Sequence, residues 1–288
     1  VGSEMCIRDR GYKDFGYECK NKEKNIYEGF LVKVDDTKLD LSKASSGEKE
    51  ILNFLLGIFA LNIKNGVLII DEPELHLHPK WQRVLLELFD DFAKYRGIQF
   101  FIVTHSPYFI TPESIRKTFR VYFEDGESRI VVPQNLDEND KDLFMLVNIF
   151  NNTKVFFADK IILVEGDVDL IIYESILERL QFDMQSSKVI EIIKIQQEGG
   201  VKKNKNFLEK WQIKTYAIVD KDKSNEVQEL DRVFILKKGK IEDYFRDIIN
   251  KDHYSIDDAL KISKKIKDSS IPVPQELEEI FKKIINDN

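Results

Sequence analysis

Residues 157–169 read FADKIILVEGDVD, and this stretch decides the architecture of the second half of the chain. Its apolar run, Ile161–Val164, is typical of a buried strand and ends directly at Glu165, which a glycine follows. Asp169 then opens an amphipathic pattern that predicts a helix. Because glycine allows a sharp bend, we expect the carboxylates of Glu165 and Asp169 to converge at one strand-to-helix turn.

Three more apolar runs in the chain end at polar residues and precede helix-like stretches: Val67–Ile70, Phe100–Val103 and Ala217–Val219. This alternation predicts an α/β fold with mainly parallel sheets, in which the chemistry gathers at the carboxyl ends of strands. Two amphipathic patterns near the C-terminus, residues 255–266 and 275–285, predict surface helices.

Composition limits the classes of protein to consider. With 288 residues, 42% of them hydrophobic, the chain can build two ordinary domains. Its 44 basic and 51 acidic residues give a net charge of −7, so contact with phosphate requires a local basic cluster. Only two cysteines are present and no apolar run is long enough to span a bilayer, which together predict a cytoplasmic protein.

The sequence also indicates where its domains begin and end. Residues 1–10 (VGSEMCIRDR) have no signal-peptide or periodic pattern and resemble a translated sequencing-adapter tract, so we expect the natural sequence to begin upstream. Residues 120–132 predict a hairpin around Asp125-Gly126, and a polar stretch follows it. We therefore predict two domains, over residues 11–150 and 151–288.

The first domain carries a set of motifs suited to a nucleotide. The strand in Gly66–Glu72 (GVLIIDE) ends in Asp71 and Glu72, which places one carboxylate to hold Mg²⁺ and the next to orient an attacking water. Upstream, Ser45–Glu48 opens a helix expected over Glu50–Ile63, either as a phosphate-binding helix start or as an ordinary capping box. Downstream, His105 follows the strand Phe100–Val103 at the same sheet edge.

These motifs resemble those of ATP-binding-cassette ATPases of the chromosome-maintenance branch. Ser45–Glu48 is similar to the signature motif, Val67–Glu72 to Walker B, and His105 to the switch histidine. The resemblance implies that Asp71 helps to hold Mg²⁺, that Glu72 is catalytic, and that the signature reaches the ATP of a partner subunit in a homodimer. The implied nucleotide-binding residues are Ser45, Ser46, Gly47, Glu48, Asp71, Glu72 and His105.

Two further features qualify the ATPase interpretation. His76 and His78, in the PELHLHP run after Walker B, would not share a helix face and have no third ligand nearby, so a metal role is not expected. No G-x-x-x-x-G-K-[ST] run occurs in the sequence. In the family this P-loop precedes the signature, so we expect the chain as given to bind ATP poorly.

The second domain gathers carboxylates. The strand that ends at Val219 is followed by Asp220-Lys221-Asp222, whose two acids point the same way from an extended backbone. If this strand neighbours Ile161–Val164, three or four carboxylates meet at one edge and suit Mg²⁺. The alternative is a helix-capping acid and a solvated turn.

This half resembles the topoisomerase–primase (Toprim) domain. A cassette ATPase followed by a Toprim domain is the layout of the overcoming-lysogenization-defect (OLD) nucleases, which implies a two-metal site, Mg²⁺ or Mn²⁺, with ATP in the full-length protein. By this resemblance Glu242, in Gly239–Tyr244 (GKIEDY), joins the acids. The implied metal ligands are Glu165, Asp169, Asp220, Asp222 and Glu242, with Asp71 in the ATPase. The implied catalytic residues are Glu72, Glu165, Asp220 and Asp222.

The expected function is a Mg²⁺-dependent endonuclease that acts on DNA, with RNA left open, and is coupled to an ATPase. Lys202, Lys203 and Lys205 lie in a basic stretch that either contacts nucleic-acid phosphate or is solvated surface. The alternative function is an ATPase-linked sensor or scaffold whose Toprim-like domain binds without cutting. Strand transfer is not favoured, because no tyrosine lies in a recognisable cleavage motif. Defence against phage is common among relatives of this layout.

Overall fold

The structure is a computed structural model, and it describes residues 12–21, 26–33, 36, 38–40, 46–61, 63–111, 113–124, 126–132, 152–195 and 200–287. The chain divides into two compact units, Val1–Phe109 (unit 1) and Ile110–Asn288 (unit 2). The boundary expected near residue 150 falls among residues 133–151, outside the described residues, and stays a prediction. No helix of the described residues is long and apolar enough to cross a membrane.

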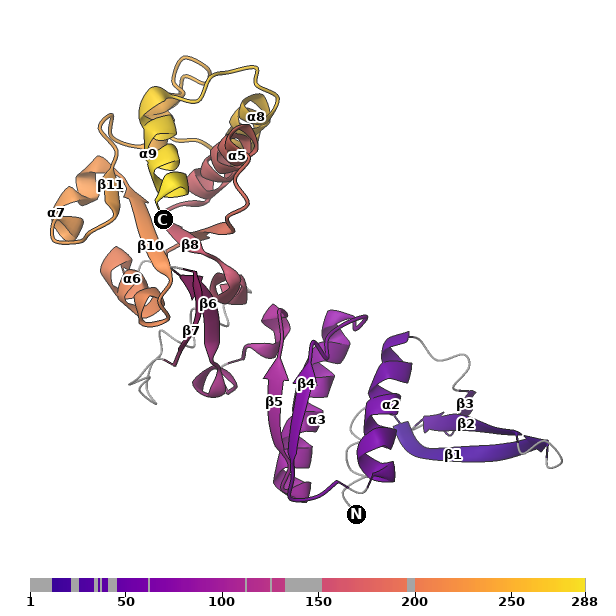
Figure 1. Cartoon of the computed structure of the whole chain (residues 1–288). Helices are drawn as coiled ribbons and strands as arrows, with labels where there is room; N and C mark the ends of the chain where they lie inside the picture. Colours follow the sequence, from indigo (N-terminus) through magenta and orange to yellow (C-terminus); the bar gives the residue numbers. More distant parts are fainter. Residues whose placement is uncertain are drawn as a thin grey trace. The chain divides into compact units, whose positions relative to one another are not determined.

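Unit 1 contains an antiparallel sheet and a βαβ unit (Figure 1). The antiparallel sheet has the order β1 (Tyr12–Asn21), β2 (Ile26–Lys33) and β3 (Lys38–Asp40). Helix α2 (Ser46–Ala60) follows, and starts four residues before the helix expected from the sequence. The βαβ unit consists of β4 (Val67–Asp71), α3 (Pro79–Arg96) and β5 (Gln99–Val103), with β4 and β5 parallel.

The ends of α3 follow from its sequence. His78 caps the first turn by accepting a hydrogen bond from Lys80 N at 3.3 Å, Pro79 occupies the first turn, and Gly97 ends the helix with φ of 64°. One face of the β4–β5 pair packs on α3 and α2, while the other face is exposed, with Ile69 at 76% exposure.

Unit 2 is built on a four-stranded sheet of order β11-β10-β8-β9, and every neighbouring pair is parallel. Its strands are β8 (Lys160–Val164), β9 (Ile190–Lys194), β10 (Lys214–Val219) and β11 (Val233–Ile235). Leu163 pairs with Ala217, so the two strands that end in acids are direct neighbours. The predicted parallel α/β fold is confirmed.

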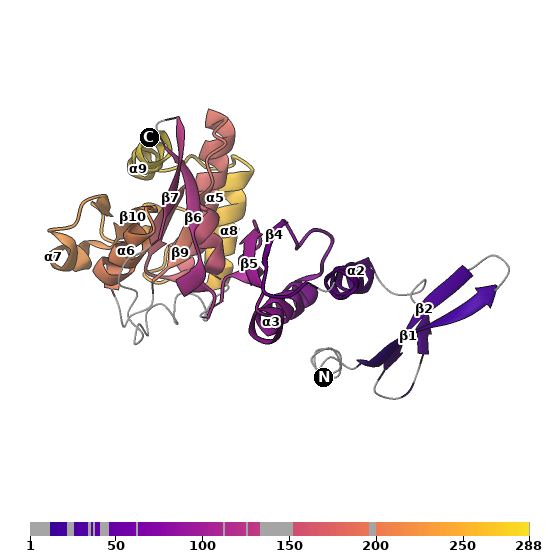
Figure 2. The same cartoon turned by 60° about the horizontal axis from the view of Figure 1, so that its bottom comes forward.

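Helices cover both faces of this sheet (Figures 1 and 2). On one face, Ile162 of β8 and Ile218 of β10 pack with α5 (Asp167–Met184), α8 (Ile256–Lys267) and α9 (Gln275–Asn286). On the other face, Ile161 and Ala217 pack with α6 (Gly200–Lys210) and Trp211. The two amphipathic C-terminal helices are therefore part of the core of this domain.

The hairpin predicted from the sequence is present as antiparallel β6 (Arg120–Glu124) and β7 (Glu127–Val131), and it belongs to unit 2, whereas the sequence assigned it to the first domain. Buried Arg120 fastens it through hydrogen bonds to the carbonyls of Phe156, Ala158, Trp211 and Gln212, at 3.0–3.1 Å. The remaining short elements are η2 (Pro107–Phe109), η3 (Ile115–Lys117), η4 (Asn152–Phe157), η5 (Lys221–Lys223), α7 (Ser224–Val227) and η6 (Ile241–Tyr244).

Candidate functional site

The carboxyl edge of the parallel sheet in unit 2 collects the predicted acids. Glu165 directly follows β8, Asp169 lies in the first turn of α5, and Asp220 directly follows β10. Asp222 lies in η5 and is exposed, whereas Glu242 in η6 is buried. The parallel register of β8 and β10 is what brings the first three to the same edge.

The turn after β8 fixes Asp169. Its Oδ2 atom accepts a hydrogen bond from Gly166 N at 2.8 Å, which caps α5 and holds the carboxylate back over the strand end. A β-carbon at position 166 would lie 2.9 Å from that same oxygen. A larger residue at position 166 would therefore push the carboxylate of this candidate ligand out of its place.

The acids of this edge repel one another. Burial, together with the charges of Asp220, Glu242 and Glu165, raises the pKa of Asp169 to about 7. Burial, together with Glu165, Asp222 and Glu242, raises the pKa of Asp220 to about 7. Burial also raises the pKa of Glu165, with Asp222 contributing repulsion. Such a group is poorly compensated by the protein and favours a cation.

Glu242 is held from a second loop. Tyr254 N donates to Glu242 Oε1 at 3.4 Å, and the Tyr254 hydroxyl donates to the carbonyls of Glu242 and Ile249 at 3.2 and 2.9 Å. Lys240, two residues before Glu242, donates to the carbonyl of Asp252, and its Nζ lies 3.2 Å from His253 Nδ1. The sequence did not identify Tyr254 or His253 as part of this region, since no strand end or motif marks them.

The donor chemistry suits a hard divalent ion, because carboxylate oxygens are the ligands that Mg²⁺ and Mn²⁺ prefer. Within the part of the chain that the structure describes, however, no three His, Cys, Asp or Glu side chains form a group that could already hold a metal ion. The acids therefore interact through their charges without forming a ready cage. A metal role for these five residues stays a prediction.

The predicted basic stretch lies on α6. Lys202 and Lys203 are exposed there, as a phosphate contact requires. Lys205 is only 1% exposed, and its ammonium pairs with Glu209 and, at 2.9 Å, with Asp231. The structure therefore removes Lys205 from the proposed nucleic-acid contact, because helical periodicity turns it into the core beside Val201 and Leu208.

In unit 1 the predicted Walker B and switch residues meet at the carboxyl end of the β4–β5 pair. Asp71 ends β4 opposite Val103, and Glu72 N donates to Val103 O at 2.8 Å. Glu72 has a left-handed backbone, with φ of 46°, a conformation that non-glycine residues adopt mainly at special sites. Its Oε1 atom lies 3.8 Å from Nε2 of exposed His105.

The structure describes only part of the predicted signature motif, Ser45–Glu48. Ser45 and the side chain of Glu48 lie outside the described residues. Ser46 is the exposed first residue of α2, and Gly47 is buried. His78 caps α3, and His76 is exposed with φ of 65°.

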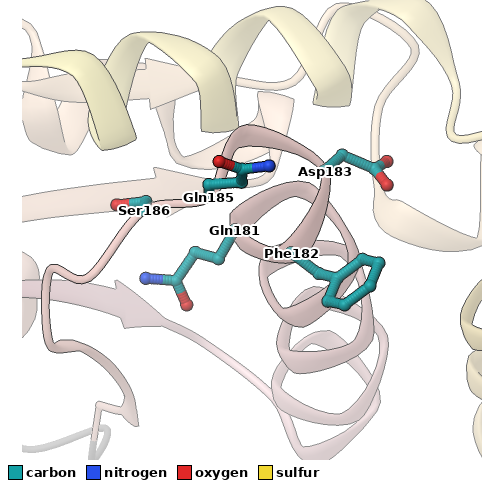
Figure 3. A pocket seen from close by; sticks show the side chains of 5 residues that line it. All are labelled: Gln181, Phe182, Asp183, Gln185 and Ser186. Carbon is teal, nitrogen blue, oxygen red and sulfur yellow. The ribbon is translucent and has the colours of Figure 1, made fainter.

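A separate hollow lies at the other end of α5. It is lined by Gln181, Phe182, Asp183, Gln185 and Ser186 around the C-terminal end of the helix (Figure 3). Because Asp169 is in the first turn of the 18-residue helix, this hollow lies far from the acids. The candidate site at the sheet edge is thus separate from this hollow.

Comparison with known proteins gives two family matches. Residues 10–111 match the model described as "AAA domain, putative AbiEii toxin, Type IV TA system". Residues 156–222 match the model described as "Overcoming lysogenization defect protein-like, TOPRIM domain". The second match contains β8, the turn at Glu165 and the Asp220–Asp222 pair.

Individual relatives agree with these matches. An OLD nuclease of Thermus scotoductus is 31% identical over 141 residues, which are 45% of this chain and 26% of that protein. The Old nuclease of Escherichia phage P2 is 21% identical over 198 residues, 64% of this chain and 34% of that protein. An uncharacterized protein of Methanocaldococcus jannaschii is 29% identical over 153 residues, which are 51% of this chain and 19% of that protein. The chain spans about a third or less of these relatives.

The fold and the two matched segments describe the class as an ATPase-type segment followed by a Toprim domain. The family matches make this definite: the chain combines an AAA-domain segment with an OLD-like Toprim domain. The resemblance to the OLD family, inferred from the motifs, is thereby confirmed.

Proposed function

We propose that this chain is the nuclease-bearing part of an ATP-coupled endonuclease that uses Mg²⁺ or Mn²⁺ to hydrolyse phosphodiesters of DNA. The observation that carries the proposal is the convergence of Glu165, Asp169 and Asp220 at the edge of one parallel sheet, where burial and mutual repulsion raise their pKa values. A cation bound among them would relieve this repulsion.

The chemistry follows from the ligands. Bound divalent metal would activate a water and stabilise the departing oxygen of the phosphodiester. In this chain Glu165, Asp169, Asp220, Asp222 and Glu242 would hold it. The hydrogen bond from Gly166 N orients Asp169, and Tyr254 holds Glu242, so the ligands are positioned by the fold. Exposed Lys202 and Lys203 are the proposed phosphate contacts.

The ATPase part of the proposal rests on unit 1. Asp71 and Glu72 end β4 beside His105, which supports roles in holding Mg²⁺, polarising water and sensing the γ-phosphate. Ser45, Ser46, Gly47 and Glu48 would serve the ATP of a second copy, so a homodimer is part of this proposal. Cytoplasmic location and a role in defence against phage remain proposals of the same kind.

The decisive experiment measures nicking of supercoiled plasmid DNA, with labelled single-stranded RNA in a parallel arm. We expect cleavage of the plasmid with Mg²⁺ or Mn²⁺, none with EDTA, and loss of cleavage in Glu165→Gln and Asp220→Asn. The matched control is Asp167→Asn, because exposed Asp167 lies in the same turn but pairs with Lys194 at 2.7 Å. This control should cleave like the wild type.

Other outcomes identify the alternative. If no variant or metal gives cleavage, yet DNA is retained equally by wild type and Asp220→Asn, the chain is a binding module linked to an ATPase. The described residues hold no ready metal cage, and this observation favours testing that second function. If the protein cleaves the RNA and not the plasmid, its substrate is RNA and not DNA.

A further inference from the structure

The loop between β4 and α3, residues 72–78, is joined to the loop that carries His105. Glu74 Oε1 accepts a hydrogen bond from His105 N at 2.8 Å, across 31 residues of sequence. Leu77 N donates to Glu74 O at 2.9 Å, and Leu75 N donates to Glu72 O at 3.1 Å, so two turns fix the backbone on both sides of Glu74. The carboxylate therefore projects from a rigid segment that starts at Glu72.

A second side chain spans the same two loops. Gln82, on α3, is buried, and its Nε2 donates to Leu77 O at 2.8 Å. Its Oε1 accepts from the Ser106 hydroxyl, and Ser106 Oγ in turn accepts from Tyr108 N at 3.1 Å. Ser106, the residue that follows His105, is thus tied to α3.

The third contact reaches the start of α2. A β-carbon at Gly47 would lie 3.3 Å from Trp81 Cδ1 and 3.4 Å from Leu77 Cδ2. The backbone at Gly47 therefore lies directly on the start of α3. Segments 47, 72–78 and 105–106 share one scaffold, although they are far apart in the sequence.

We propose that Glu74 is a positioning residue that sets the place of His105 relative to Glu72. A carboxylate is a stronger acceptor for a backbone N–H than a neutral group. The other oxygen, Oε2, is buried and has no hydrogen-bond partner among the described residues, so the bond to His105 N defines how the carboxylate is held. The inference rests on the proposed ATPase function for its purpose, but the contact can be tested without it.

The test is amide hydrogen exchange, followed by NMR on the whole 288-residue chain. Glu74→Ala should speed exchange of the His105 amide at least about tenfold, because its acceptor is gone. Glu74→Gln, whose amide oxygen can accept the same bond, should restore exchange to within about threefold of the wild type. The chain has four histidines, so the ring signals of His105 can be followed separately and should shift only in Glu74→Ala.

Matched controls exclude a general loosening. Glu50→Ala and Glu50→Gln change an exposed acid of α2 and should leave the His105 amide unchanged. Gln82→Leu removes the hydrogen bonds of Gln82 with Leu77 O and with the Ser106 hydroxyl. It should speed exchange of the Tyr108 amide, which bonds to Ser106 Oγ, while the His105 amide keeps its protection. Thermal unfolding of each variant shows whether it is folded.

Several results would overturn the inference: unchanged exchange in Glu74→Ala, failure of Glu74→Gln to restore it, or equal loosening of the His105 amide in Gln82→Leu. If Glu74→Ala does not fold, Glu74→Leu takes its place, because leucine fills similar space without offering an acceptor to His105 N, and it should speed exchange as Glu74→Ala does. Binding of Mg²⁺-ATP, measured by calorimetry, is a separate readout. Because no P-loop run occurs in the sequence, weak binding is expected. An affinity for Mg²⁺-ATP that Glu72→Gln and His105→Ala leave unchanged, together with a protected His105 amide, would remove the proposed ATPase role and leave the positioning contact intact.

Discussion

At the scale of single residues, burial changes what a lysine can do. Lys205 places its ammonium between Glu209 and Asp231, whereas Lys202 on the same helix is exposed. We expect Lys205→Ala to lower the free energy of unfolding by about 2 kcal/mol, because it removes a buried side chain together with its two ion pairs, although Arg232 still pairs with Glu209 at 3.1 Å. Lys202→Ala should leave stability unchanged and weaken DNA binding. Urea unfolding measures the stability of each variant, and fluorescence anisotropy measures its affinity for DNA. Reduced DNA affinity in folded Lys205→Ala would contradict the structural role given to Lys205.

The acids at the sheet edge make stability depend on pH. The pKa values of Asp169 and Asp220 are about 7 in the folded protein, against about 4 for aspartate in an unfolded chain. Between these values the native state binds protons that the unfolded state releases, so the contribution of these two groups to stability is fully present below about pH 4 and is lost as pH rises through about 7.

In EDTA we therefore expect the free energy of unfolding to be about 1–3 kcal/mol lower at pH 8 than at pH 5, as measured by urea denaturation. Asp220→Asn should reduce this difference, and Mg²⁺ or Mn²⁺ should stabilise the wild type at pH 8. An unchanged pH dependence in Asp220→Asn would show that other groups cause it.

At the scale of elements, the β6–β7 hairpin depends on one side chain. The guanidinium of Arg120 donates hydrogen bonds to four carbonyls, and the single ammonium of a lysine cannot reach all of them. We therefore expect Arg120→Lys to destabilise the hairpin by about 2–3 kcal/mol. Amides of β6 and β7 should exchange faster, while those of β8 and β10 stay protected. The control Arg129→Lys, which changes an exposed arginine paired with Glu124 at 2.8 Å, should behave like the wild type.

Elements with strong patterns were predictable from the sequence. Strands β8 and β10 finish in continuous apolar runs, Ile161–Val164 and Tyr216–Val219, and the meeting of the acids that follow them at one edge was expected from the parallel arrangement. Strands β1–β3 carry charged residues throughout and give no such signal. The Glu74–His105 bond joins groups 31 residues apart, which no local pattern encodes. Burial of Lys205 could have been predicted, since it shares a helix face with Val201 and Leu208.

At the scale of the whole molecule, unit 2 carries its own core on both faces of its sheet, together with all five candidate metal ligands. We expect a chain of residues 110–288 to fold alone and to unfold in one cooperative transition. Circular dichroism melting and an NMR spectrum of dispersed amides measure this. If it aggregates or melts without cooperativity, unit 2 requires unit 1 for stability.

The turn at Gly166 also limits how this sequence can diverge. Any other side chain there would bring a β-carbon to 2.9 Å from Asp169 Oδ2, so a single codon change would shift a candidate ligand. Neighbouring Asp167 is exposed and carries no such constraint. In a lineage that keeps its activity, we expect positions 166 and 169 to persist as a pair while position 167 drifts. A lineage that loses the activity would release both together, so this pair of codons would record the loss.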